Sequence, residues 1–228
     1  MKPLNLLEYI YAIEDYHFDL AYPREIRELS DRHWTPVEVA RKAAEFLVRE
    51  PGTRVLDIGC GPGKFCIVGA LATEGRFTGV EQRPHLCAAA RSVIDQAQIP
   101  NAAIIHGNLT AMDFSHFDAF YLFNPFQENL ETNAKIDLTV KLSSELYDQY
   151  TEHVARQLAL APLRTRVATY CGACEEVPMG YECIDSSSGC DLKFWEKTKH
   201  HPVRPSAQGP TSTNRKWRFM VGAIEPAA

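Results

Sequence analysis

The sequence has no long hydrophobic run. None of its apolar stretches approaches the roughly 18 consecutive apolar residues that a membrane-spanning helix requires. The first residues also lack the uninterrupted apolar core of a signal peptide, since Glu8, Glu14 and Asp15 break their apolar positions. We therefore expect a cytoplasmic protein without a membrane segment or a targeting peptide.

Positive charge is scarce over most of the chain. The 228 residues contain 24 Lys and Arg against 29 Asp and Glu, and seven of the basic residues fall between Lys193 and Arg218. The acidic remainder argues against a broad nucleic-acid surface, which needs Lys and Arg along a groove. The basic segment, with prolines and serines between His200 and Ser212, is typical of a solvated terminus, although it also suits phosphates or an acidic partner.

The seven cysteines are an odd number, and their distribution does not suggest a disulfide framework. Small buried thiols are ordinary packing, which is the expectation for Cys60, Cys66 and Cys87. A zinc site is the alternative for a second group of four cysteines, but six residues separate its last two cysteines, which therefore do not form a second tight knuckle. The residues of this alternative zinc set are Cys171, Cys174, Cys183 and Cys190. We predict instead that the protein binds no metal and lies in a reducing compartment.

The most informative segment is a short apolar strand, Val55 to Ile58, that runs into Gly59, Gly61 and Gly63. Residues without Cβ allow a sharp turn with positive φ and the close approach of a ligand to the backbone. Asp57 places a carboxylate near this turn, where it would repel a phosphate and attract an ammonium group. The pattern predicts a ligand with a cationic end.

Two common nucleotide sites do not fit this loop. A dinucleotide site reads G-x-G-x-x-G, whereas the third glycine here comes one residue early, and a P-loop needs Ser or Thr where Phe65 follows Lys64. The segment instead resembles the D-x-G-x-G-x-G signature of class I S-adenosylmethionine-dependent methyltransferases. The resemblance covers roughly residues 35 to 197. It implies S-adenosylmethionine as cofactor and S-adenosylhomocysteine as product.

The resemblance also assigns roles at the ends of the next two strands. Residues 76–80 read as a second strand that ends on Glu81, which is placed to accept both ribose hydroxyls. The third strand, residues 102–106, leads to Asn108 and Leu109, which are expected to meet the adenine amino group and ring through a side-chain oxygen and a backbone N–H. The residues expected to bind the cofactor are Asp57, Gly59, Cys60, Gly61, Gly63, Glu81, Gln82, Asn108, Leu109 and Asn124.

A fourth strand, residues 117–123, delivers Asn124, Pro125 and Phe126 at its carboxyl end, where ligands bind in open α/β sheets. This element resembles a shortened [DNS]-P-P-[YF] motif of amino-group methyltransferases and, more weakly, the Asn-Asn-Phe stretch of Dot1-type lysine methyltransferases. Both resemblances imply nitrogen as the acceptor, with these three residues as the catalytic group. The alternative is that Asn124 caps the strand and Pro125 ends it.

Three helical pieces are expected before the glycine loop. The apolar spacing of Leu6, Ile10 and Ile13 predicts a helix over residues 4–16, and a short piece covers 24–32. Thr35 as N-cap, with Pro36 and Glu38 behind it, predicts a third helix through Val48. The aromatic residues of this region are candidates for an acceptor pocket or, alternatively, for a patch that fastens the helices to the sheet. They are Tyr16, His17, Phe18, Tyr22 and Trp34.

Beyond the fourth strand, a polar stretch over residues 127–137 is placed to border the acceptor. The apolar spacing then predicts a long helix over residues 137–160, and three strands follow over 164–170, from Gly180, and over 191–197. Too few residues separate Cys171 from Gly180 for the usual helix there. The fold expected is α/β: a Rossmann-like, doubly wound, mostly parallel seven-strand sheet with an antiparallel C-terminal strand and an N-terminal helical extension. The parts are the extension (1–50), the cofactor-binding methyltransferase domain (51–198) and the basic tail (199–228).

Three functions remain open from the sequence. The first is methyl transfer to a nitrogen of a small molecule or a protein side chain. The second is transfer to an oxygen of a metabolite; the metal-dependent form of that reaction would need acidic ligands where Asn124 stands. The third is a binding protein that keeps the fold and the adenosyl ligand without transfer. The sequence leaves the acceptor and the oligomeric state open.

Overall fold

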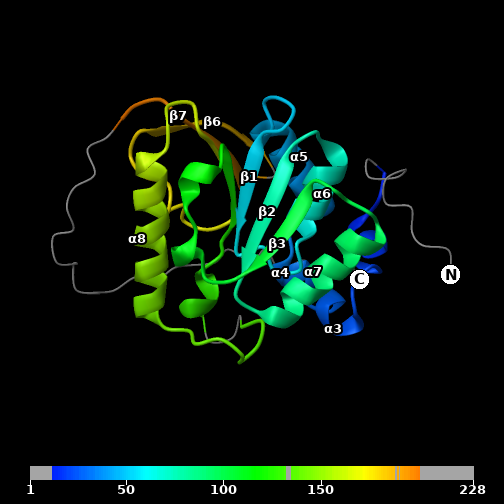
Figure 1. Ribbon diagram of the computed structural model, residues 1–228. Helices are drawn as coiled ribbons and strands as arrows, with labels where there is room; N and C mark the ends of the chain where they lie inside the picture. The colour runs from blue at the N-terminus through cyan, green and yellow to red at the C-terminus, as the bar shows by residue number, and fades with distance from the viewer. Residues whose placement is uncertain (1–11, 132–134, 188, 190, 201–228) are drawn as a thin grey trace, which may run out of the picture.

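The structure is a computed structural model that describes residues 12–131, 135–187, 189 and 191–200. Its centre is a seven-stranded sheet with the strand order β3-β2-β1-β4-β5-β7-β6 (Figure 1). The strands are β1 (Arg54–Ile58), β2 (Arg76–Glu81), β3 (Ala102–His106), β4 (Ala119–Phe123), β5 (Arg166–Tyr170), β6 (Tyr181–Ser187) and β7 (Leu192–Lys197).

Six of the seven strands run in one direction. The pairs from β3 through β5 are parallel, and β7 is antiparallel to both β5 and β6. The chain order reverses between β1 and β4, so the carboxyl ends of these two strands form the switch point at which ligands bind in such sheets. The predicted fold class, including its antiparallel C-terminal strand, is confirmed.

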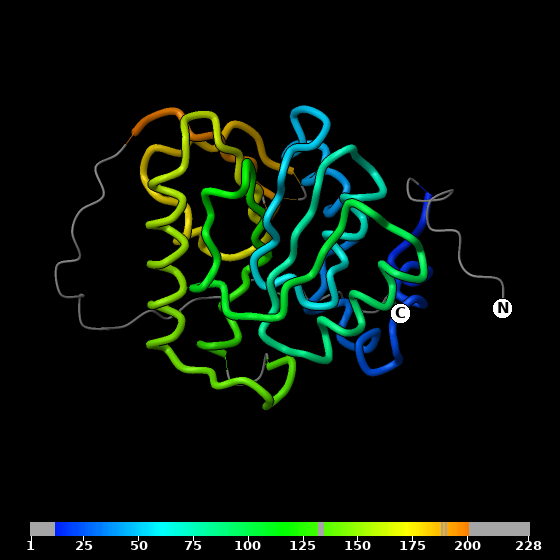
Figure 2. Tube along the Cα trace, viewed as in Figure 1, coloured from blue at the N-terminus to red at the C-terminus, as the bar shows by residue number. Residues whose placement is uncertain are grey.

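Helices cover the two faces of the sheet unequally. On one face α5, α6 and α7 pack over Val55 of β1, and on the other α8 packs over Leu56 and Ile58. Figure 2 shows α8 alone on its side of the trace. This alternation follows from the strand period of two. The bounds of these helices are α5 (Val37–Leu47), α6 (Lys64–Ala72), α7 (Pro84–Gln96) and α8 (Ser144–Leu160).

The N-terminal helical region differs from the prediction in its boundaries. Residues 12–14 are not helical, and the first described helix is α2 (Asp15–Asp19); the rest of the predicted 4–16 helix lies outside the described residues. The piece predicted at 24–32 is two separate turns, α3 (Arg24–Arg27) and α4 (Ser30–His33). The break has a tertiary cause, because the indole N–H of Trp34 donates to the carbonyl oxygen of Ile26 at 2.8 Å, where a continuous helix would place Ser30 N–H.

The predicted cap of α5 is wrong. The Thr35 hydroxyl lies 3.0 Å from the Tyr121 hydroxyl in the core, and the helix begins at Val37 after Pro36. The Val37 N–H donates instead to Asp15 Oδ1 at 2.9 Å. A carboxylate 22 residues away in the sequence therefore caps the helix.

The helix predicted over 137–160 is also too long at its start. Asp137 Oδ1 accepts from the backbone N–H and the hydroxyl of Thr139, which makes a local turn rather than a helix. The helix begins at Ser144, because the Ser143 side chain accepts from Leu146 N–H as an N-cap. Leu138, expected on the apolar face, is 86% exposed.

The segments that connect the main elements are short or contain only single turns of 3₁₀ helix. No helix occurs between β5 and β6, as expected from the short distance between Cys171 and Gly180. Three 3₁₀ turns lie near the carboxyl ends of β3 and β4 and in the link between them. They are η1 (Leu109–Ala111), η2 (Phe114–His116) and η3 (Gln127–Asn129).

Lys64, the first residue of α6, fastens the N-terminal helices to the sheet. Its side chain is 2% exposed, and its ammonium group donates to Asp15 at 2.6 Å, to Asp19 at 2.8 Å and to Ser30 at 3.4 Å. Asp15 and Asp19 are one helical turn apart, so α2 presents both carboxylates on one face. This buried charge cluster links α2 and α4 to the end of the glycine loop.

Replacing this ammonium group should destabilise the protein strongly. In Lys64→Met the buried Asp19 carboxylate and the partly exposed Asp15 carboxylate lose their cation. We expect the free energy of unfolding to fall by about 3–5 kcal/mol in urea titrations. The matched control is Lys42→Met, which removes the exposed pair with Glu38 on α5 and should change the free energy of unfolding far less, because solvent screens exposed pairs. Equal and small losses in both variants would contradict this account.

Candidate functional site

The loop from β1 to α6 keeps all three glycines in the left-handed region, with φ values of 74°, 54° and 76° for Gly59, Gly61 and Gly63. A Cβ on Gly59 would lie 3.0 Å from Pro125 Cβ, and a Cβ on Gly61 would lie 2.7 Å from the Trp34 ring. The loop therefore needs glycine both for its backbone conformation and for the close contacts it makes.

Glu81, the last residue of β2, holds this loop. Its carboxylate accepts from Gly61 N–H at 3.2 Å and from Arg83 N–H at 2.8 Å, one bond on each oxygen. Each oxygen keeps a lone pair for another donor. Burial raises the pKa of Glu81, and these N–H groups together with the Arg83 charge act against that rise.

Asn124, Pro125 and Phe126 follow β4 directly beside the glycine loop. Asn124 has a φ of 38°, which is uncommon for a residue with a side chain and often marks a functional site. A Cβ at Gly172 would lie 2.8 Å from Asn124 Oδ1, so this position accepts only glycine without displacing the amide. Among the described residues, none donates a hydrogen bond to Asn124 Oδ1 or to the Pro125 carbonyl oxygen.

These elements surround a cavity of about 570 Å³, within the usual size of a small-molecule site. Its acidic lining residues outnumber the basic ones: Asp15, Asp31, Glu81, Glu128 and Glu131 against Arg32 and Arg83. The predicted site residues that line it are Gly59, Gly61, Glu81, Gln82, Leu109, Asn124, Pro125 and Phe126. Those that do not are Asp57, Cys60, Gly63 and Asn108.

Asp57 lies behind the loop. It is 3% exposed and accepts a hydrogen bond from the Cys66 thiol at 3.5 Å. Burial raises the pKa of Asp57 to about 8; the thiol lowers it and the nearby Glu81 raises it further. A carboxyl group with this pKa is mostly protonated at neutral pH.

Cys60 and Gly63 serve the packing of the loop. A Cβ at Gly79 would lie 2.5 Å from Cys60 Sγ, which places this thiol against β2. Gly63 precedes α6 and lies close to Ala90 and Ile104, so it allows the helix to approach the sheet. Both positions support the loop from behind.

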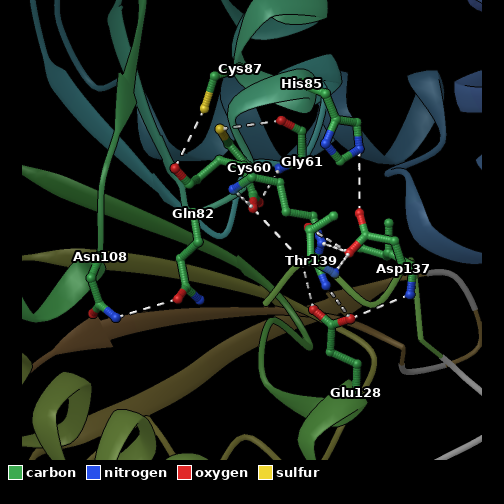
Figure 3. Close-up of polar contacts among 12 residues, drawn as sticks. Cys60, Gly61, Gln82, His85, Cys87, Asn108, Glu128, Asp137 and Thr139 are labelled. Carbon is green, nitrogen blue, oxygen red and sulfur yellow. Dashed lines mark hydrogen bonds and ion pairs between the residues drawn. The ribbon is translucent and has the colours of Figure 1, made fainter. Parts of the chain in front are cut away.

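Asn108 caps a turn. Its Oδ1 accepts from Thr110 N–H at 3.0 Å and from the Thr110 hydroxyl at 2.9 Å. Its amide nitrogen donates to the Tyr150 hydroxyl at 2.9 Å and to Gln82 Oε1 at 3.4 Å; Figure 3 shows the bond to Gln82. The side-chain oxygen expected to face the adenine amino group is thus already bonded within the protein.

Arg83 connects the Glu81 side of the cavity to the segment after β4. Its side chain is 2% exposed and forms two parallel hydrogen bonds with Glu128, at 2.9 and 2.8 Å, and one with Asp137 at 3.1 Å. Burial lowers the pKa of the guanidinium, but these partners and Glu81 outweigh it and raise the pKa overall. Figure 3 shows Glu128 and Asp137 close to each other, with dashed lines for their hydrogen bonds and ion pairs.

The N-terminal aromatic residues differ in where their rings lie. Phe18 and Tyr22 are buried in the core, which agrees with the patch that fastens the helices to the sheet, while Tyr16 is 72% exposed. Trp34 lines the cavity and lies against Gly61. Only this last ring lies both on the cavity and on the glycine loop.

The cysteines proposed as an alternative zinc set do not form one in the part of the chain that is described. No group of three or more metal-ligating side chains occurs there, and Cys190 lies outside the described residues. Cys171 lines the cavity, and burial raises the pKa of its thiol to about 11. Within the same residues, no helix has the length and apolar character needed to cross a membrane.

Sequence reasoning missed Arg83 and Tyr150. Tyr150 falls between Leu146 and Val154 at the four-residue spacing of the apolar face of α8, and this spacing was the available signal. Arg83 carries no such pattern, because its partners Glu128 and Asp137 come from another part of the chain. The rest of the basic segment, from residue 201 onward, lies outside the described residues.

Comparisons with known proteins point to one family. Residues 55–142 match the profile described as "Methyltransferase domain". The demethylmenaquinone methyltransferase of Listeria welshimeri is 32% identical over 77 residues, which cover 32% of this chain and 33% of that protein. The chain thus aligns with about a third of the length of the curated relatives it matches.

Solved structures agree in fold. An RNA methyltransferase from Salinibacter ruber, in complex with S-adenosyl-L-homocysteine, gives a TM-score of 0.52 at 19% identity, covering 74% of this chain and 95% of that one. TrmN from Thermus thermophilus gives 0.54 at 17% identity, covering 76% and 52%. At these identities the comparison establishes the Rossmann-like fold of methyltransferases.

The buried carboxyl group of Asp57 should make stability depend on pH. Between about pH 4 and pH 8 the folded protein keeps this proton and the unfolded chain loses it, so the free energy of unfolding falls as pH rises. Asp57→Asn removes this effect. The free energy of unfolding of the variant minus that of the wild type should grow by up to about 1.4 kcal/mol per pH unit over this range and should level off above it.

Urea titrations from pH 4 to pH 9 measure this difference, with Asp118→Asn as the control. The hydrogen bond from Arg54 lowers the pKa of Asp118, so its contribution to stability is complete above pH 4 and constant from pH 5 to pH 8. A pH-independent difference for Asp57→Asn would refute the protonated state.

Proposed function

We propose that this protein binds S-adenosylmethionine and transfers its methyl group to a nitrogen. The premise is that residues 55–142 match a methyltransferase domain and that the strands over residues 54–197 form a seven-stranded Rossmann-like sheet. The observation that carries the proposal is the shared cavity. The glycine loop, Glu81 and the Asn124-Pro125-Phe126 element, which lie far apart in the sequence, all line it.

The residues present fit this cofactor. Gly59 leaves backbone exposed where an amino acid moiety would lie, and Gly61 lies beside it on the cavity. Glu81 keeps one lone pair on each oxygen for two ribose hydroxyls. Gln82 and Leu109 border the far end, where we place the adenine. We assign Asp57, Cys60, Gly63 and Asn108 to the support of this surface.

The acceptor nitrogen is assigned to the end of β4. Asn124 Oδ1 and the Pro125 carbonyl have free lone pairs, so they can accept hydrogen bonds from an amino group and turn its lone pair toward the methyl. Phe126 is 3% exposed and supplies an apolar wall. When bound, the cofactor supplies a methyl group on a positively charged sulfur; the protein holds the acceptor in line with it and excludes water.

Charge supports an amine rather than a nucleic acid. Five carboxylates and two guanidinium groups line the cavity, and a phosphate backbone would be repelled by this balance. A metabolite amine and a protein side chain both satisfy it. Transfer to an oxygen would leave Asn124 Oδ1 and the Pro125 carbonyl oxygen without a role as a pair of hydrogen-bond acceptors.

The remaining assignments follow the same proposal. We assign residues 1–50 to a cover over the acceptor end, supported by Trp34 against Gly61, residues 51–198 to the catalytic domain, and residues 199–228 to a basic tail. The unpaired cysteines among the described residues support a reducing compartment, for which we propose the cytoplasm.

Loss of the ribose contact should weaken cofactor binding. Glu81→Gln removes the charge from two hydrogen bonds, and we expect its dissociation constant for S-adenosylhomocysteine to rise by about 10- to 100-fold. Isothermal titration calorimetry measures this, with the exposed Glu38→Gln as control. Absence of binding to the wild-type protein would refute the proposed function.

Loss of the acceptor contact should act on transfer rather than on binding. We expect Asn124→Ala to lower the rate of methyl transfer by about 100-fold, because the amino group is no longer aligned, with little change in affinity for S-adenosylhomocysteine. Transfer of labelled methyl to a panel of amines and matched hydroxyl compounds measures this. Asn124→Asp keeps an accepting oxygen and should retain more of the rate, whereas an unchanged rate in Asn124→Ala would exclude the nitrogen assignment.

A further inference from the structure

The side chains at the carboxyl end of β3 form a hydrogen-bond chain whose direction can be assigned. Asn108 Oδ1 faces the backbone N–H of Thr110 at 3.0 Å. A backbone N–H can only donate, so the Asn108 atom that faces it is the oxygen. The other end of the amide is therefore the NH₂ group, which can only donate.

This fixes the role of the Tyr150 hydroxyl. Asn108 Nδ2 lies 2.9 Å from the Tyr150 oxygen, so the amide donates and the phenol oxygen accepts. The phenol proton must then point elsewhere. Among the described residues, the Tyr150 hydroxyl makes no hydrogen bond other than the one with Asn108.

The unpaired proton belongs to a buried side chain on the cavity. Tyr150 is 6% exposed, its ring centroid lies 5.5 Å from that of Phe126, and it lines the same cavity as Leu109 and Gln82. A buried donor without a partner is costly, and such groups in native proteins usually have a partner in a ligand or in water. The Gln82 side-chain oxygen accepts from the Asn108 amide at 3.4 Å and makes no hydrogen bond with Tyr150.

We propose that Tyr150 is a cofactor-binding residue that donates its phenol proton to a ring nitrogen of the adenine, and that Asn108 is the residue that positions it. This inference rests on the proposed function. Within the strand order β3-β2-β1-β4, Glu81 on β2 takes the ribose, so the base lies toward the end of β3, where Leu109 and Tyr150 line the cavity. Adenine presents N1, N3 and N7 as neutral acceptors for an O–H donor.

The experiment compares S-adenosylhomocysteine with its 1-deaza, 3-deaza and 7-deaza analogues by calorimetry. For the wild-type protein we expect one of the three analogues to bind about three- to tenfold more weakly than the parent, the value of one neutral hydrogen bond. Tyr150→Phe should bind S-adenosylhomocysteine more weakly by the same factor. The variant should bind that analogue as tightly as it binds S-adenosylhomocysteine. This loss of discrimination identifies a direct contact, since a general disturbance of the site would not cancel for one analogue alone.

The matched control is Tyr147→Phe on the same helix. The Tyr147 hydroxyl donates to Glu175 at 3.2 Å and does not line the cavity, so this variant should keep the wild-type affinities for all four compounds. Asn108→Asp tests the positioning role, because its second oxygen would accept the phenol proton and draw it away from the base. It should lose the same discrimination between the parent and the deaza analogue while its tyrosine is intact.

The outcomes are separable. If the wild-type protein binds S-adenosylhomocysteine and Tyr150→Phe binds it equally well, the inference is wrong and the proposed function stands. Suppose that all three analogues bind more weakly than S-adenosylhomocysteine by one common factor, and that this factor is the same in the wild type and in Tyr150→Phe. The contact to a ring nitrogen is then excluded. If the wild-type protein does not bind S-adenosylhomocysteine, the proposed function and this inference both fail.

Discussion

The carboxylate of Glu81 is the interaction on which the site depends. It ties the glycine loop of β1 to the end of β2 through Gly61 N–H, and it ties β2 to the start of α7 through Arg83 N–H. Because Arg83 also holds Glu128 and Asp137, the segment after β4 is anchored to the same point. Through Arg83, the carboxylate proposed to bind the ribose is therefore connected to the segment that follows the proposed acceptor contacts.

The second constraint is the buried ammonium group of Lys64. Lys64 begins the helix that follows the glycine loop, and its partners Asp15, Asp19 and Ser30 come from the N-terminal helices. Asp15 also caps α5. A single charge cluster thus places the N-terminal region, with Trp34 against Gly61, over the cavity. Such a cluster is costly to break, because the Lys64 and Asp19 charges are buried only together with their partners.

Together these contacts divide the proposed site into parts with separate chemistry. The base end is polar but uncharged, with Gln82 and Tyr150, and the centre carries the Glu81 carboxylate. The acceptor end offers the unpaired oxygens of Asn124 and Pro125 beside an acidic rim. Backbone strain is concentrated there as well, since Asn124, Cys171 and Cys174 all have positive φ near the ends of β4 and β5. Strain of this kind persists only where surrounding contacts enforce it.

The sequence by itself determined the strands, the glycine loop and the positions of Glu81 and Asn124, because these follow from local patterns: apolar runs, residues without Cβ, and the common edge at which parallel strands end. It misplaced the cap of α5 and the start of α8, where Asp15 and the turn at Asp137 replaced the expected local signals. Only the tertiary structure decided that Asp57 is buried with a raised pKa, that Asn108 bonds within the protein, and that Arg83 and Tyr150 line the cavity. The physical reason is that burial and hydrogen-bond partners depend on segments far apart in the chain, which no local pattern specifies.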